Sequence, residues 1–157
     1  MTGFRRGVRL GVDVGRARVG VARSDPDGML AVPVETVPRS EQSIERIAVI
    51  AEEYGPVEIV VGLPVNMQGA DTASTVDARE FAAALCARTR IPTRLVDERL
   101  STVSAHAALR SSGRTQKNSR SIVDQVAAVV LLQQAIDTEK STGNPPGVTI
   151  PLDEESS

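Results

Sequence analysis

Acidic residues at three places in the sequence could act together on a phosphate ester. Asp13 lies in the alternating run VRLGVDV, Asp97 and Glu98 follow the apolar run TRLV, and Asp124 lies in a long helical pattern near the C-terminus. Ligands of α/β sheets collect at the carboxyl ends of the strands, which each of these positions can reach. Carboxylates that share one place repel one another unless cations neutralise them. Oxygen ligands suit Mg²⁺, and a pair of such ions can activate water against a phosphodiester.

Each acid also has a structural interpretation. Asp13 precedes a turn and could accept backbone N–H groups from it, or serve as the carboxylate of a phosphate loop. The acids of the VDER sequence could simply pair with Arg99. Ser121-x-x-Asp124 fits a capping box, in which the acid completes the start of a helix. The residue types alone leave the catalytic and the structural interpretations open at each position.

The pattern of apolar residues predicts the elements that would position these acids. Alternation and turn residues predict three strands in an antiparallel meander, and the continuous run VEIVVG predicts a strand buried on both faces. The predicted strands are 8–14, 18–23, 30–37, 57–62 and 93–98, and the predicted helices are 40–54, 75–89, 101–110 and 121–139. This order predicts an α/β fold with a mixed five-stranded sheet, three antiparallel strands followed by βα units, flanked by helices.

Asp124 falls on the side of the final predicted helix that must pack on the sheet. Helical spacing aligns it with Ala128, Leu131 and Ala135, which form an apolar stripe. A charge on a packing stripe needs a partner. The capping box and a shared metal site are two different ways to supply one.

The length of 157 residues suits one domain, which we expect to span residues 1–140. The Pro-Pro-Gly segment and the acids near the C-terminus predict a disordered acidic tail over residues 141–157. No apolar run approaches the roughly 20 residues that cross a bilayer, and the N-terminus lacks the apolar segment of a secretory signal. We therefore expect a cytoplasmic protein with no membrane partner.

Cys86 and His106 are the only cysteine and the only histidine in the chain, so cysteines can form neither an internal disulfide nor a zinc cluster. Cys86 lies in an Ala/Leu-rich helical stretch and is expected to be a small core residue, with an intermolecular contact or a reactive thiol as the alternative. His106 has no nucleophile in evident register and is expected to face solvent or to pack in a helix.

The positive charge of the chain is concentrated in one segment. The net charge is −2, but the last 17 residues carry three acids and no base, which leaves the first 140 residues at +1. No acid occurs between Arg99 and Asp124, whereas that interval contains several basic residues: Arg110, Arg114, Lys117 and Arg120. Such a segment is either a solvated surface or a contact for phosphates.

Four blocks of the sequence, in this order, resemble the YqgF/RuvX family of the RNase H-like superfamily. They are LGVDVGRARVGVARSD at 10–25, VVGLPVNMQG at 60–69, LVDERLSTVSA at 95–105 and KNSRSIVDQVAAVVLLQ at 117–133. The resemblance implies an RNase H-like nuclease that depends on Mg²⁺ or Mn²⁺. It implies that the catalytic, metal-binding acids are Asp13, Glu98 and Asp124, with Asp97 as the alternative to Glu98.

The same resemblance implies a nucleic-acid substrate. Gly62, Pro64, Asn66 and Gly69 match a family loop near the active site, and two arginines stand in the first turn, where the family often has lysine. The residues expected to contact nucleic acid are Arg16, Arg18, Asn66, Arg99, Arg110, Arg114, Lys117 and Arg120. With only three aromatic residues to stack on bases, recognition by backbone and shape is expected.

Family members are associated with processing of the 5′ end of the 16S ribosomal RNA precursor, which is the expected function. The first alternative is a Holliday junction resolvase, which predicts a homodimer because symmetric cleavage needs two active sites. Cys86 on an exposed helix face could stabilise such a dimer, and a monomer is the other expected state. A second alternative is a catalytically silent RNA-binding ribosome factor. An actin-like ATPase is disfavoured because the chain has room for only one domain.

Overall fold

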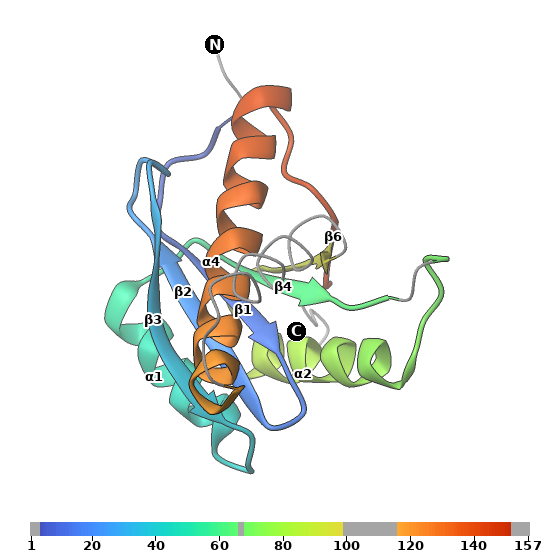
Figure 1. Cartoon of the computed structure of the whole chain (residues 1–157). Coiled ribbons are helices and arrows are strands. Elements are labelled where there is room, and N and C mark those ends of the chain that lie inside the picture. The colour runs from blue at the N-terminus through green and yellow to red at the C-terminus, as the bar shows by residue number, and fades with distance from the viewer. Residues whose placement is uncertain (1–3, 66–67, 99–115, 152–157) are drawn as a thin grey trace.

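The computed structural model describes residues 4–65, 68–98 and 116–151, and for residues 116–124 it describes the backbone alone (Figure 1). Within these ranges, no helix combines the length and the apolar character needed to cross a membrane. The described elements form one sheet with helices on both of its faces.

The sheet contains six strands in the order β3-β2-β1-β4-β5-β6. The first three form the predicted antiparallel meander, while β4 and β5 continue the sheet parallel to β1. The strands are β1 (Arg9–Val14), β2 (Arg18–Ser24), β3 (Ala31–Pro38), β4 (Glu58–Leu63), β5 (Thr93–Asp97) and β6 (Val148–Thr149). The helices are α1 (Ser43–Tyr54), α2 (Ala73–Thr89) and α4 (Gln116–Thr142).

Each face of the sheet carries its own hydrophobic core. Helix α4 crosses one face, and α1 and α2 cover the other (Figure 1). Successive residues of β4 point to opposite faces, so Ile59 and Val61 join the core under α1 and α2, whereas Val60 packs under α4. The prediction that this strand is buried on both faces is confirmed. The apolar stripe of α4 is also confirmed, since Ala128, Leu131 and Ala135 are buried against the sheet.

The sixth strand lies within the predicted disordered tail and corrects that prediction for its first part, while residues 152–157 lie outside the described residues. Helix α4 extends to Thr142, and the chain then returns to pair Val148 and Thr149 with β5 in the antiparallel sense. Gly147 makes this return possible, because its φ of 78° is unfavourable for other residues and a Cβ there would collide with the Leu95 carbonyl. A two-residue strand with both side chains exposed leaves no apolar pattern in the sequence, which explains why the sequence predicts only five strands.

The final helix also begins earlier than predicted. It starts at Gln116 rather than Ser121, so position 124 lies in its interior and the capping-box interpretation of Asp124 is wrong. The helix predicted over residues 101–110, together with His106, lies outside the described residues.

Cys86 is a core residue of α2. It is 2% exposed, and its thiol lies 3.6 Å from the carbonyl oxygen of Ile91. The expectation of a small core hydrophobe is confirmed, and the alternative that it lies on an exposed helix face is wrong. A disulfide between two copies of the chain would require this part of α2 to open.

Candidate active site

Asp13 lies near the end of β1 on the face of the sheet that α4 covers. Its neighbours Val12 and Val14 belong to the core under α1 and α2, so alternation along the strand turns the half-buried Asp13 to the other face. On one side, Gly20 of β2 pairs with Asp13. On the other side, Val12 pairs with Val61 of β4, so the next residue of β4, Gly62, lies beside Asp13. Glycine on both sides leaves space around the Asp13 carboxylate.

The Glu98 side chain, which comes from the end of β5, fills part of that space. It follows β5 directly, is only 8% exposed, and reaches over the backbone of β4 at Gly62. A Cβ on Gly62 would stand 2.7 Å from Glu98 Cγ and 2.9 Å from Glu98 Cδ. The glycine is therefore what allows the Glu98 carboxylate to lie on the same side of the sheet as Asp13.

Asp97 is turned the other way. Leu95 belongs to the core under α1 and α2, while Val96 packs toward α4, so alternation directs Asp97 to the α1 and α2 side. Of the two adjacent acids, Glu98 is the one that shares a face with Asp13.

Helix α4 approaches β1 closely beside these acids. A Cβ at Gly11 would stand 2.8 Å from Leu132 Cβ and 2.9 Å from the Ala128 carbonyl oxygen, distances that real side chains do not adopt. Glycine at this position therefore lets the helix backbone lie directly on the strand. The contact fixes how far α4 stands above the sheet where it passes Asp13.

A hydrogen bond shows which part of α4 lies at the level of Asp13. Gln125 Nε2 donates to Thr36 Oγ1 at 2.7 Å. Thr36 pairs with Gly20, and Gly20 pairs with Asp13, so the three residues form one row across the sheet. Position 124 is thus at the height of Asp13, on the helix face that carries the buried stripe. The side chain of Asp124 itself is outside the described part of the chain.

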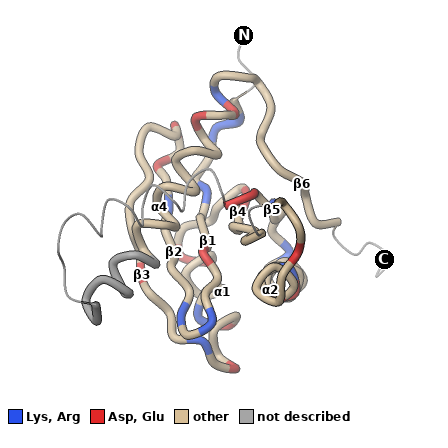
Figure 2. Tube along the Cα trace, turned by 45° about the vertical axis from the view of Figure 1, so that its right-hand side comes forward, with Lys and Arg blue, Asp and Glu red and all other residues tan. Residues whose placement is uncertain are grey.

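The two arginines of the first turn lie on different sides of the sheet. Arg18 precedes Val19, which faces the core under α1 and α2, so Arg18 shares the α4 face with Asp13. Arg16 is exposed on the turn and lies toward the side of the sheet that α1 and α2 cover. Figure 2 shows basic residues gathered at this turn between β1 and β2.

The remaining residues expected to bind nucleic acid fall outside what the structure describes. Asn66, Arg99, Arg110 and Arg114 lie in the undescribed segments. For two others, Lys117 and Arg120, only the helical backbone is described.

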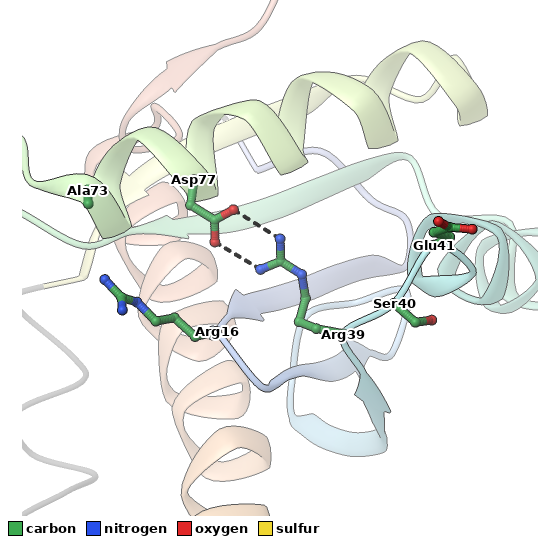
Figure 3. Close-up of a pocket in the computed structure, with 6 residues that line it drawn as sticks. All are labelled: Arg16, Arg39, Ser40, Glu41, Ala73 and Asp77. Carbon is green, nitrogen blue, oxygen red and sulfur yellow. Dashed lines mark hydrogen bonds and ion pairs between the residues drawn. The ribbon is translucent and has the colours of Figure 1, made fainter.

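An open hollow of about 610 Å³ lies beyond the β1–β2 turn, beside the start of α2. Figure 3 shows Arg39 joined to Asp77 by two interactions, with Arg16 on the Ala73 side and Glu41 on the other. Its lining residues are Arg16, Arg39, Ser40, Glu41, Ala73 and Asp77. Sequence reasoning missed the Arg39–Asp77 pair, because the partners are 38 positions apart and neither belongs to a motif.

The donors on the α4 face fit a hard divalent cation. Asp13 and Glu98 offer only oxygen, and the glycines beside them leave the room that such an ion and a phosphate need. Among the described side chains, which do not include that of Asp124, no three histidine, cysteine or acidic residues are grouped so that they could hold a metal ion. A metal at this site would be held by Asp13, Glu98 and Asp124, with the third ligand supplied from α4.

The chain is similar in sequence and in structure to known proteins. A family model described as "RuvX: Holliday junction resolvase" matches residues 7–138. A protein of Leifsonia xyli subsp. xyli is 57% identical over 146 residues, which cover 92% of this chain and 94% of the relative. A protein of Clavibacter michiganensis subsp. michiganensis is 55% identical over 151 residues, 94% of either chain. Both relatives carry the name "Putative pre-16S rRNA nuclease".

Among solved structures, RuvC of Thermus thermophilus, in a complex with a Holliday junction substrate, superimposes with a TM-score of 0.53. It is 17% identical, and the match covers 88% of this chain and 98% of the other. At this identity the likeness concerns the fold, and it confirms the predicted RNase H-like class.

Proposed function

Because this chain belongs to the RuvX family, we propose that it is a metal-dependent nuclease that processes the 5′ end of the 16S ribosomal RNA precursor. The observation that carries the proposal is the placement of Glu98 over Gly62, on the face and at the strand ends where Asp13 lies. The names of the close relatives support this substrate. Ribosome assembly would place the protein in the cytoplasm.

The three acids divide the work of holding divalent ions. Asp13 projects from a central strand, Glu98 reaches in from the end of β5, and Asp124 belongs to the helix that packs on β1. Bound Mg²⁺ or Mn²⁺ would supply activation of water and stabilisation of the leaving oxygen, with two ions sharing these tasks. Gly20 leaves the β2 side of Asp13 without a side chain, so a phosphate can approach the carboxylates from that side.

Basic residues around the site would contact the phosphates of the substrate. Arg18 lies on the α4 face beside Asp13, and Arg16 extends the positive surface around the turn. Phe81 is buried in the core, which leaves few aromatic rings for stacking on bases. Binding should therefore depend strongly on salt and weakly on base identity. The full proposed contact set is Arg16, Arg18, Asn66, Arg99, Arg110, Arg114, Lys117 and Arg120.

A second candidate function is resolution of Holliday junctions. The description of the matching family model and the likeness to RuvC favour it. This function requires two active sites on one junction and therefore a homodimer, whereas end processing of an RNA requires only one. Cys86 would contribute nothing to such a dimer, because it is buried in the core of α2.

One assay separates these functions. Wild type and Asp13→Asn are incubated with Mg²⁺ or Mn²⁺ and either a 16S rRNA precursor or a four-way DNA junction. We expect the wild type to cut the precursor and Asp13→Asn to bind it without cutting. Asp27→Asn, an exposed acid paired with Arg6, is the control and should cut normally. Binding without cutting by the wild type would favour a silent ribosome factor, and paired cuts in the junction alone would favour a resolvase.

A further inference from the structure

We propose that Arg39 is a positioning residue that fixes the turn between β1 and β2 and, through that turn, the place of Asp13. The inference rests on the proposed function, because it takes Asp13 to be a metal ligand. It assigns a role to a side chain that lies outside the four sequence blocks and does not itself approach the reacting atoms.

The Arg39 side chain connects three parts of the fold. Its Nη1 donates to the carbonyl oxygen of Gly15 at 2.9 Å, and the guanidinium forms two 2.9 Å interactions with the Asp77 carboxylate on α2. The same group lies 5.0 Å from the centre of the Phe81 ring. The backbone N–H of Arg39 also donates to the Ala17 carbonyl at 3.0 Å. Arg39 therefore holds the turn at two points and ties it to α2.

The turn that Arg39 holds begins two residues after Asp13. Gly15 closes it by donating its N–H to the Arg18 carbonyl at 2.9 Å, and a Cβ on Gly15 would stand only 2.7 Å from that oxygen. The carbonyl of Gly15 points away from this internal bond and is the group that Arg39 binds. Asp13 is the last but one residue of β1, so the path of the β1 backbone into the turn positions its Cα and helps to set where the carboxylate lies.

The Arg39–Asp77 pair has the geometry of a rigid support. A guanidinium binds a carboxylate through two parallel N–H groups, whereas a lysine offers a single flexible point charge. The Arg39 side chain is 24% exposed and Asp77 is 39% exposed, so the pair is partly shielded from solvent. The hydrogen bonds from Arg39 hold the pKa of Asp77 below its ordinary value, and the charge of Arg16 adds to this effect. Asp77 is thus ionised at neutral pH and keeps Arg39 in place.

Binding of Mn²⁺ measured by titration calorimetry, without substrate, distinguishes this role from a simple charge effect. Removal of a positively charged side chain near a metal site should tighten metal binding, because the repulsion between that charge and the metal ion disappears. Loss of a support should weaken it, because the ligand is no longer held in place. We expect Arg39→Ala to bind Mn²⁺ about tenfold more weakly than the wild type, as for other residues that orient metal ligands.

The matched control is Arg88→Ala, which removes an equally two-pronged pair between the same helix and Glu45 of α1. It should leave Mn²⁺ affinity unchanged. Arg39→Lys should recover only part of the loss. Asp77→Asn, which keeps the shape but removes the charge, should cause a smaller loss and serves if Arg39→Ala folds poorly. Hydrogen exchange of the turn, residues 15–18, should be faster in Arg39→Ala and Asp77→Asn than in Arg88→Ala.

The outcomes are distinct. Unchanged or tighter Mn²⁺ binding by folded Arg39→Ala would overturn the inference, and the proposed function would stand if the wild-type binding is lost in Asp13→Asn. If wild-type Mn²⁺ binding does not depend on Asp13, both the inference and the proposed metal site fail.

Discussion

The Glu98 carboxylate occupies the space that a side chain at Gly62 would need. The relationship explains why a glycine follows the buried β-branched residues 59–61 near the end of β4. Packing alone would favour a larger residue there, so the glycine serves the carboxylate rather than the core.

Gly62→Ala should therefore separate stability from activity. The added methyl group meets the Glu98 side chain from Cγ outward and no backbone atom, so Glu98 can rotate away and the free energy of unfolding should change by about 1 kcal/mol. Cleavage should fall by about 10- to 100-fold, because the displaced carboxylate no longer faces Asp13. Thermal unfolding and the cleavage rate are measured together. As a contrast, Gly11→Ala meets the backbone oxygen of Ala128 and should destabilise the fold. Full activity in Gly62→Ala would show that Glu98 need not lie there.

Glu98→Gln and Asp97→Asn test which of the two adjacent acids is the ligand. Both substitutions preserve shape and remove one negative charge. We expect Glu98→Gln to abolish Mg²⁺-dependent cleavage and Asp97→Asn to retain most of it, because only Glu98 shares the face of Asp13. Cleavage rates over a range of Mg²⁺ concentrations measure the effect. The reverse ranking of the two variants would mean that the strand end rearranges when metal binds.

Glu139 anchors the far end of α4 and should make stability depend on pH. It is 2% exposed, accepts hydrogen bonds from Arg5 at 2.8 and 2.9 Å, and lies 3.3 Å from the buried Arg9. Figure 2 shows acidic and basic residues together at this end of α4. Burial raises the pKa of Glu139, but the hydrogen bonds from Arg5 and the charge of Arg9 outweigh it and leave the pKa below its ordinary value.

A lowered pKa in the folded state means that Glu139 stabilises the fold above its unfolded pKa of about 4.3, and that the contribution disappears as the pH falls through the folded value. Glu139→Ala should lower the free energy of unfolding by about 3 kcal/mol at pH 7, since it leaves Arg9 buried without its partner. The difference between Glu139→Gln and wild type should shrink below pH 4. Urea unfolding from pH 3 to 7 measures this, with the exposed Glu45→Gln as a control that should change little. A constant difference across that range would contradict the assignment.

The Cys86 thiol should react slowly in the native protein. Because the side chain is 2% exposed, a thiol reagent reaches it only when α2 opens locally. Reaction with an aromatic disulfide should be slow in buffer and complete rapidly in urea. Fast reaction without denaturant, or a dimer that reducing agent dissociates, would contradict the buried position.

The sequence predicted the sheet more fully than it predicted the site. Alternation around Asp13 located β1, and continuous apolar residues located β4, because each pattern reflects burial within a single strand. Choosing between Asp97 and Glu98 required knowing which face Leu95 occupies. The Ser121-x-x-Asp124 pattern predicted a helix start that the structure does not have. Both residues lie inside a helix that begins at Gln116, so they cannot cap it.

What the sequence could not predict depends on residues that meet only in the folded chain. The Arg39–Asp77 pair joins a strand end to a helix, and β6 pairs two residues from the far end of the chain with β5. Such contacts follow from the topology of the sheet, which a pattern within one element does not contain.

The Glu139 anchor also determines the axial position of α4. Fifteen residues separate Glu139 from position 124, which at about 1.5 Å per residue is roughly 22 Å of continuous helix. The ion pairs of Glu139 with Arg5 and Arg9 fix the C-terminal part of the helix. The position of every residue toward its N-terminal end is measured from that fixed point. A slip of one turn would move position 124 by about 5.4 Å and take it away from the row of Asp13. Charge pairs at the far end of α4 therefore set where position 124 stands along the helix axis, and with it where the proposed third carboxylate would enter the site.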